Sequence, residues 1–163
     1  MKKINVYVDM DGTVAEWDGS VYIEDIVKEG YFRNRPAMKN SVEAIRKMAL
    51  NEKFEVFILS AVFAYDHIKE DKKNWLKEHM PEISDDHILF VPCGTSKSDA
   101  ITVKEDTDVL IDDFTQNLNS WHGKAIKIYN GINGTKGSWT GYSVHSSMNS
   151  ECLQKQLEAI CLI

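Results

Sequence analysis

The chain has 163 residues, 43% of them hydrophobic, and a formal net charge of −6 from 19 basic and 25 acidic residues. This length is typical of one domain, and the hydrophobic content suffices for a sheet with helices on both faces. The acidic balance argues against a broad nucleic-acid-binding face, which would normally be basic. We therefore expect a single domain over residues 1–163 that does not bind a nucleic acid polymer.

Signals for export and for membrane insertion are missing from the sequence. The N-terminal MKKINVYVDMDG lacks the apolar core of a signal peptide. No run approaches the roughly 18 apolar residues of a membrane span. The three cysteines, Cys93, Cys152 and Cys161, form no CxxC pair and cannot all pair within one chain. These observations predict a cytoplasmic protein without a membrane partner.

The stretch VYVDMDGTV over residues 6–14 carries two carboxylates at the end of a predicted strand. Residues 4–8 have the pattern of a buried parallel strand, which turn residues stop abruptly. Asp9 and Asp11 leave the strand end on the same side, and Gly12 allows a ligand to approach the main chain. A hard cation such as Mg²⁺ would relieve the repulsion between the carboxylates. The alternative is a plain β-turn, since Asp and Gly are common turn formers.

A second acidic pair follows another short apolar run. Residues 108–111 predict a buried strand, and Asp112 and Asp113 come directly before a helix-like stretch over residues 115–122. Carboxylates in this position could cap the helix or bind a metal with the first pair. Which of the two would ligate the metal directly is left open.

Two more strand-like runs precede groups that could hold an anion. The run FEVFIL is followed by Ser60 and Ala61, which offer a hydroxyl and backbone amides. The run ILFV is followed by a loop of small residues that contains Lys97. Lys104, in the next polar stretch, is the rival for the role of an active-site lysine.

The remaining segments predict helices and a small insertion. Apolar positions with helical spacing predict helices over residues 40–50, 66–80 and 151–163, which gives a βαβ-like order. The pattern breaks over residues 14–38, which are aromatic and of mixed charge and should form a cap. The aromatic residues could fill the cap's own core, or stack on a base while Arg33 or Arg35 meets a charged group.

The order of these residues resembles the haloacid dehalogenase-like phosphatase superfamily. Its DxDG[TV] motif is matched by Asp9–Thr13, its hydroxyl by Ser60, its lysine best by Lys97, and its acidic pair by Asp112 and Asp113. The resemblance implies an α/β fold with a three-layer Rossmannoid core, a parallel sheet, and a small helical cap inserted after the first strand, at about residues 14–38.

Within that superfamily the chain is similar, over nearly its whole length, to the 5′(3′)-deoxyribonucleotidases. The similarity includes DMDGT, LIDDFTQNLNSW, YFRNRPAM and the Gly-rich NGINGTKGSW. One departure is that Lys97 lies fifteen residues before Asp112, a longer gap than in the animal enzymes. The resemblance implies hydrolysis of (deoxy)ribonucleoside monophosphates, with Trp17, Phe32 and Arg33 as candidate substrate-binding residues of the cap. Dimers are common in that family, so the resemblance also allows a homodimer, although no residue of the sequence indicates one.

The chemistry of phosphate monoesters assigns a role to each site residue. We predict that Asp9 attacks phosphorus to give an aspartyl-phosphate, while Asp11 serves as the general acid and then the general base. Mg²⁺ would be held by Asp9, the main-chain carbonyl of Asp11, and Asp112 or Asp113, with Asp113 favoured by the resemblance.

The phosphoryl oxygens would be held by Ser60, Ala61 and Lys97, with Lys97 offsetting the charge of the transition state. Two other functions stay open. One is a phosphatase for another small ester such as a sugar phosphate. The other is a phospho-acceptor signalling or binding domain, against which the DxDGT order and the insertion both count.

Overall fold

The computed structural model describes residues 2–101, 107–132 and 139–163. In this part of the chain six strands form one sheet in the order β3-β2-β1-β4-β5-β6, and every neighbouring pair is parallel. The strands are β1 (Ile4–Val8), β2 (Phe54–Val62), β3 (Ile88–Pro92), β4 (Val109–Asp112), β5 (Lys124–Tyr129) and β6 (Tyr142–His145). The predicted α/β fold with a parallel sheet is therefore confirmed.

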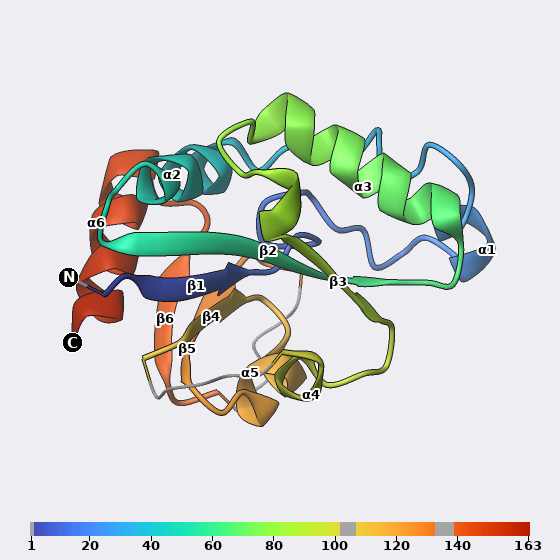
Figure 1. The fold of residues 1–163 in the computed structure, drawn as a ribbon. Helices are drawn as coiled ribbons and strands as arrows, with labels where there is room; N and C mark the ends of the chain where they lie inside the picture. The colour runs from blue at the N-terminus through green and yellow to red at the C-terminus, as the bar shows by residue number, and fades with distance from the viewer. Residues whose placement is uncertain (1, 102–106, 133–138) are drawn as a thin grey trace.

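Helices cover both faces of the sheet, which gives three layers (Figure 1). Helices α2, α3 and α6 lie on one face, and α4 and α5 lie on the other. Their bounds are α1 (Ile23–Ile26), α2 (Lys39–Ala49), α3 (Asp66–His79), α4 (Lys97–Ala100), α5 (Thr115–Ser120) and α6 (Ser150–Leu162), with a 3₁₀ turn at Asp85–His87. Among the residues described, no helix is both long enough and apolar enough to span a membrane.

The side chains of each strand alternate between two cores, because successive residues of a strand point to opposite faces. In β1, Val6 and Val8 pack in the core that contains residues of α2 and α6, such as Ile45 and Leu157. Tyr7 points the other way and packs in the core that contains residues near α5. Burial on both faces explains why the central strands have continuous apolar sequences.

Most predicted elements lie within one or two residues of their expected bounds, and two expectations are wrong. Strand β2 runs to Val62, so Ser60 lies inside the strand and not after it. Lys97 is the first residue of the short helix α4 and not part of an open loop. Strands β5 and β6 were not predicted.

The segment of residues 14–38 contains little regular structure apart from α1. Its buried residues Ile26 and Phe32 pack with Val62 of β2 and Ile68 of α3. The aromatic residues of this segment therefore share a core with the edge of the main domain, and they do not form a core of the segment alone. This packing brings the segment over the carboxyl ends of β1 and β2.

Candidate active site

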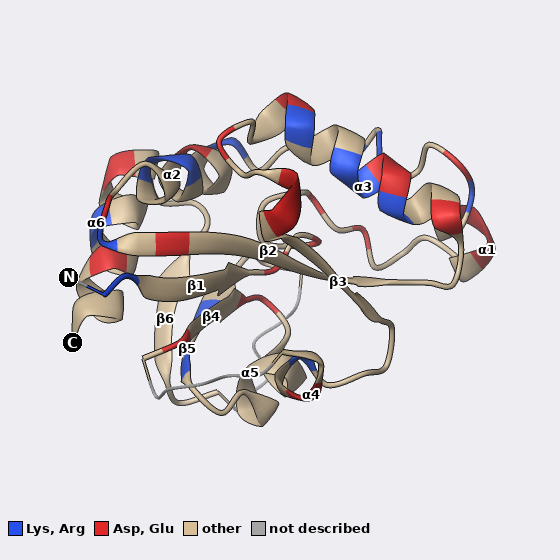
Figure 2. Cartoon of the chain, in the orientation of Figure 1, with Lys and Arg blue, Asp and Glu red and all other residues tan. Residues whose placement is uncertain are grey.

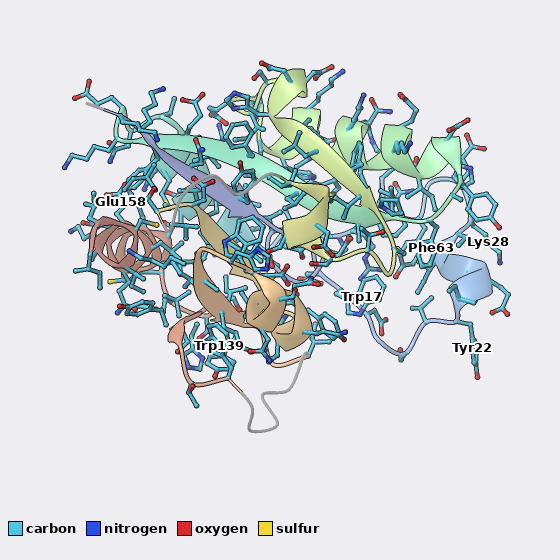
Figure 3. The ribbon with its side chains drawn as sticks, turned by 60° about the horizontal axis from the view of Figure 1, so that its bottom comes forward. Trp17, Tyr22, Lys28, Phe63, Trp139 and Glu158 are labelled. Atoms are coloured by element: carbon cyan, nitrogen blue, oxygen red, sulfur yellow. The ribbon has the colours of Figure 1, made fainter. Side chains whose placement is uncertain are left out.

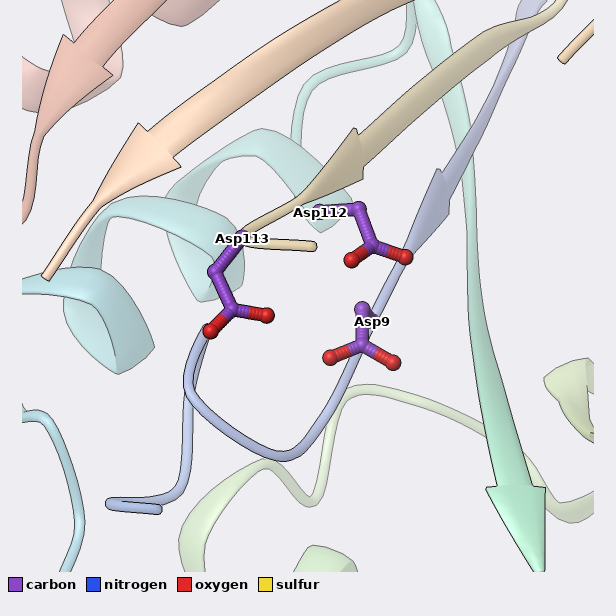
Figure 4. Close-up of side chains that lie close together, drawn as sticks. All are labelled: Asp9, Asp112 and Asp113. Atoms are coloured by element: carbon purple, nitrogen blue, oxygen red, sulfur yellow. The ribbon is translucent and has the colours of Figure 1, made fainter. Parts of the chain in front are cut away.

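Three buried carboxylates meet at the carboxyl ends of neighbouring strands. Asp9 follows β1, Asp112 ends β4, and Asp113 follows it. Because β1 and β4 are paired in parallel, these ends lie side by side. One oxygen of each carboxylate lies within 4.8 Å of the others, and the three side chains face one another (Figure 4). All three residues are buried, so their charges are poorly screened by water.

The turn after β1 depends on glycine at position 12. The carbonyl of Met10 accepts the N–H groups of Val14 and Ala15, which tightens the chain directly after Asp9. Gly12 has a φ of +87°, a conformation that other residues rarely adopt. A Cβ atom at this position would lie 2.2 Å from Oδ2 of Asp113. The missing side chain therefore makes room for the carboxylate of Asp113, directly after β4.

Lys97 connects the two acidic segments. Its Nζ atom donates to Oδ1 of Asp9 and to Oδ2 of Asp112, both at 2.6 Å, and its side chain is almost fully buried. Burial would lower the pKa of Lys97, but Asp112 and Asp9 outweigh it and raise the pKa. The rival Lys104 lies outside the described residues.

The pKa of Asp9 lies well above its usual value. Burial is the main cause, Lys97 opposes it, and Asp112, Asp113 and Asp11 raise the pKa further. A carboxylate in this position would be stabilised by a cation. Three buried all-oxygen side chains within this distance fit a hard divalent ion such as Mg²⁺. In addition, Oδ1 of Asp11 is buried without a hydrogen-bond partner.

The two carboxylates at the end of β4 have different partners. Asp112 accepts the N–H of Phe114 at 2.8 Å and the amide of Asn117 at 2.9 Å, besides Lys97. These bonds hold the turn that leads into α5, but no side chain of the described residues caps this helix at its N-cap residue Phe114, so helix capping by Asp112 is not observed. Oδ2 of Asp113 accepts the amide of Asn130 at 2.7 Å, and this amide also donates to the carbonyl of Gly12.

Sequence reasoning missed Lys72 of α3. Its Nζ atom donates to Oδ2 of Asp11, to Oγ of Ser60 at 2.8 Å, and to the carbonyl of Ala61 at 2.8 Å. The side chain is fully buried. The signal was its spacing, because Lys72 lies four residues after the buried Ile68, on the inward stripe of the helix.

Sequence reasoning also missed Lys127 of β5. Its Nζ atom donates to the carbonyl of Asp113 at 2.8 Å and to Oγ1 of Thr115 at 2.6 Å. Burial lowers the pKa of Lys127, and Asp113 and Asp112 oppose this effect. No sequence pattern marked this residue, since its strand was not predicted.

A cavity of about 270 Å³ opens above the carboxylates. Its floor contains Asp9, Asp11, Asp112 and Asp113. Its other lining residues are mostly apolar or aromatic: Trp17, Phe32, Ala61, Phe63, Cys93, Phe114 and Asn117. Trp17 and Phe63 belong to the same apolar cluster. Figure 3 shows Tyr22 at the outer edge of the molecule, with Trp17 and Phe63 closer to its centre.

The structure brings together most of the residues expected at the site. Trp17, Phe32 and Ala61 line the cavity, whereas Ser60 is not among its lining residues and its hydroxyl accepts a hydrogen bond from Lys72. Arg33 does not line the cavity; it is exposed and pairs with Glu78 at 3.3 Å.

Known proteins share this sequence and this fold. The family model of 5′ nucleotidase, deoxy (pyrimidine), cytosolic type C protein matches residues 16–141. That range contains Ser60, Lys97, Asp112 and Asp113, and it begins after Asp9 and Asp11. One solved structure, a chain of a Pnkp1/Rnl/Hen1 complex, covers 87% of this chain and 47% of its own length, with 15% identity and a TM-score of 0.54. That likeness concerns the fold alone.

Curated relatives agree with the family model. A Staphylococcus epidermidis protein provisionally named 5′(3′)-deoxyribonucleotidase is 33% identical over 114 residues, which is 69% of this chain and 57% of that protein. A 5′(3′)-deoxyribonucleotidase of Clostridium acetobutylicum is 30% identical over 77% of this chain and 70% of its own length. The chain thus spans little more than half the length of the staphylococcal relative. By the extent of the family match, the chain belongs to the 5′ nucleotidase, deoxy (pyrimidine), cytosolic type C family.

Proposed function

We propose that this protein is a Mg²⁺-dependent phosphomonoesterase that hydrolyses (deoxy)ribonucleoside monophosphates to a nucleoside and phosphate. The observation that carries the proposal is the buried cluster of Asp9, Asp112 and Asp113 at the floor of a small, aromatic-walled cavity. The cavity volume lies just below the roughly 300–1,000 Å³ of typical ligand pockets, which suits one small molecule. The names of the relatives point to the same substrate class.

Hydrolysis proceeds in two displacements at phosphorus. An oxygen of Asp9 attacks phosphorus, and the ester oxygen leaves and takes a proton from Asp11. Water then attacks the aspartyl-phosphate and gives a proton to Asp11, so that phosphate leaves and Asp9 is restored. The position of both carboxylates in the cavity lining supports these roles.

Asp9, the main-chain carbonyl of Asp11, and Asp113 would hold the metal. Asp112 already accepts from Lys97, Phe114 and Asn117, which favours Asp113 as the direct ligand. When bound, Mg²⁺ supplies positive charge between the nucleophile and the dianionic phosphate.

The phosphate would be bound by groups near the carboxyl end of β2 and at the start of α4. Lys97 contacts Asp9 directly, so its ammonium lies within reach of a phosphoryl group that Asp9 attacks. Ser60 and Ala61 would add a hydroxyl and backbone amides. An ammonium aimed at the phosphoryl oxygens stabilises the charge of the transition state.

The nucleoside would lie between the aromatic walls of the cavity. Trp17 and Phe32 of the cap, residues 14–38, would contact the base together with Phe63 after β2 and Phe114 before α5. Arg33 has no part in this arrangement, because its guanidinium pairs with Glu78 away from the cavity.

Phosphate release tests the proposal. The substrates are ribo- and deoxyribonucleoside monophosphates with 5′ or 3′ phosphates and a set of sugar phosphates, each with Mg²⁺ or with EDTA. We expect turnover that needs Mg²⁺ and is fastest on nucleotides. Turnover on sugar phosphates alone would support phosphomonoesterase activity and refute the nucleoside pocket. No turnover on any ester would refute the proposal that the protein is a phosphomonoesterase.

A further inference from the structure

We propose that α3 positions two parts of the site at once: Asp71 fixes the cap, and Lys72, its neighbour, fixes Asp11 and Ser60. This inference rests on the proposed function, since it assigns the two residues to substrate binding and to catalysis respectively. Both side chains are buried although they are charged, at 8% and 0% exposure. Charged residues are rarely buried unless they are paired, so their partners indicate why they are there.

Three side chains of α3 hold the main chain of the cap. They are four residues apart and therefore lie in one row along the helix. The bonds run from Nε2 of His67 to the carbonyl of Val27 at 2.8 Å, from the N–H of Gly30 to Oδ2 of Asp71 at 2.7 Å, and from Nε1 of Trp75 to the carbonyl of Arg35 at 2.7 Å. Each bond satisfies a backbone group in a segment that has only one short helix of its own.

The row of bonds brackets the aromatic wall of the cavity. Phe32 is 2% exposed and lines the cavity, and it lies between the residues held by Asp71 and Trp75. At Gly30 the chain turns with a φ of +85°, and the carboxylate of Asp71 receives its N–H there. A charge-assisted bond of this kind is about twice as strong as a neutral one. Loss of Asp71 should therefore loosen Phe32 and weaken substrate binding.

Lys72 points from the same turn of α3 toward the reacting groups. It contacts Asp11, Ser60 and the carbonyl of Ala61, and its Nζ atom lies 4.4 Å from the centre of the Phe32 ring. An ammonium with these partners holds the Asp11 carboxylate and the Ser60 hydroxyl in fixed orientations. Misplacement of a reacting group by about 1 Å can cost 10²-fold in rate. Lys72 thus acts through Asp11 and Ser60, as a positioning residue.

Steady-state kinetics separates the two roles. We expect Lys72→Met to lower kcat about 10²-fold with little change in KM. We expect Asp71→Ala to raise KM about tenfold with kcat nearly unchanged. A tenfold change in KM corresponds to the free energy of one hydrogen bond to a charged group. Asp71→Asn keeps an oxygen that can accept the Gly30 N–H but loses the charge, so its KM should lie between those of the wild type and Asp71→Ala. Lys69→Met, an exposed lysine of the same helix, is the matched control.

A double-mutant cycle tests whether Lys72 acts through Asp11. The double variant Asp11→Asn with Lys72→Met lacks both charges of the pair, so neither charge is left buried without its partner. When Asp11 is already Asn, the further change Lys72→Met should lower kcat less than threefold. An additional loss as large as in the wild-type background would overturn the positioning role. A Lys72→Met protein in which only KM changes would also overturn the positioning role of Lys72. An Asp71→Asn protein that behaves like Asp71→Ala would overturn the role of the Asp71 oxygen in holding the cap.

Amide hydrogen exchange tests the cap bonds without any substrate. In Asp71→Ala, the N–H of Gly30 and those of residues 31–35 should exchange faster than in the wild type, while Asp71→Asn should have a smaller effect and Lys69→Met none. If the wild type releases no phosphate, the proposed function fails and the exchange still tests the cap. If the wild type is active and exchange is unchanged in Asp71→Ala, the inference fails.

Discussion

Three buried lysines contact the four acidic residues at the floor of the cavity, two through carboxylates and one through a main-chain carbonyl. Each lysine has its own task, and the pairs are Lys72 with Asp11, Lys97 with Asp9 and Asp112, and Lys127 with the carbonyl of Asp113. When all four carboxylates are ionised, the negative charges exceed the positive charges by one. Such a site favours a divalent cation and would then still attract an anionic substrate.

At the residue scale, Asp9→Asn should abolish turnover, with a loss of at least about 10³-fold in kcat. The same change should stabilise the metal-free protein. Burial raises the pKa of Asp9, so the folded state binds a proton more tightly than the unfolded state. The contribution of Asp9 to wild-type stability is therefore fully present below the ordinary Asp pKa and is lost as the pH rises through the raised value.

Urea denaturation with EDTA at several pH values measures this effect. At pH 7 the Asn variant should be more stable than the wild type, because it has no buried carboxylate to ionise. Mg²⁺ should stabilise the wild type more than the variant. A variant that is less stable than the wild type in EDTA would contradict this account of Asp9.

Gly12 is the second residue whose replacement should be severe. In Gly12→Ala the new Cβ atom would meet Asp113, and the left-handed backbone costs about 1–2 kcal/mol for other residues. We expect a lower unfolding midpoint together with a loss of Mg²⁺ response in a thermal shift assay. Gly94→Ala is a matched control, since Gly94 also has a positive φ but nothing lies within 4 Å of its Cβ position. Equal effects of the two changes on the Mg²⁺ response would contradict the close approach to Asp113.

At the element scale, β5 supports the turn between β4 and α5. Lys127 reaches from β5 to the carbonyl of Asp113 and to Thr115, and so spans the two ends of that turn. In Lys127→Met we expect Mg²⁺ affinity to fall about tenfold, the lower end of the effect of residues that orient metal ligands. Titration of activity with Mg²⁺ measures this change. Lys124→Met is the control in the same strand, since Lys124 contacts the carbonyls of Ile160 and Cys161 in α6. Unchanged affinity in Lys127→Met would show that β5 has no role in the metal site.

The central elements could be predicted because their sequence patterns are local. Strand β1, the turn at Gly12 and the acidic pair after β4 each combine an apolar run with turn residues. The contacts of Lys72 and Lys127 could not be predicted in the same way. Each depends on the packing of an element against residues 61 and 14 positions away, at Asp11 and Asp113. A charged residue in a charged helix is normally solvated, so the position of Lys72 on the inward stripe of α3 does not by itself identify its partners.

At the scale of the whole molecule, charge and cavity size both argue for a small substrate. The chain carries a net charge of −6, and both signs of charge are interspersed along α3 (Figure 2). Non-specific binding to nucleic acid depends on a basic surface that neutralises phosphates. We therefore expect a 5′-phosphorylated oligonucleotide to be dephosphorylated at least about 10²-fold more slowly than the corresponding mononucleotide. Comparable rates in the phosphate-release assay would contradict this view of the cavity.

The most direct test of the account is the detection of phosphate on Asp9 during turnover. The protein is mixed with its best nucleotide substrate and Mg²⁺ and quenched in acid, and the peptide that contains Asp9 is examined by mass spectrometry. The account predicts a transient gain of one phosphoryl group on that peptide, which forms and decays within a turnover and is missing in Asp9→Asn. Turnover with no adduct on Asp9 would contradict the two-step mechanism, and an adduct that persists without phosphate release would identify a phospho-acceptor domain instead of a phosphatase.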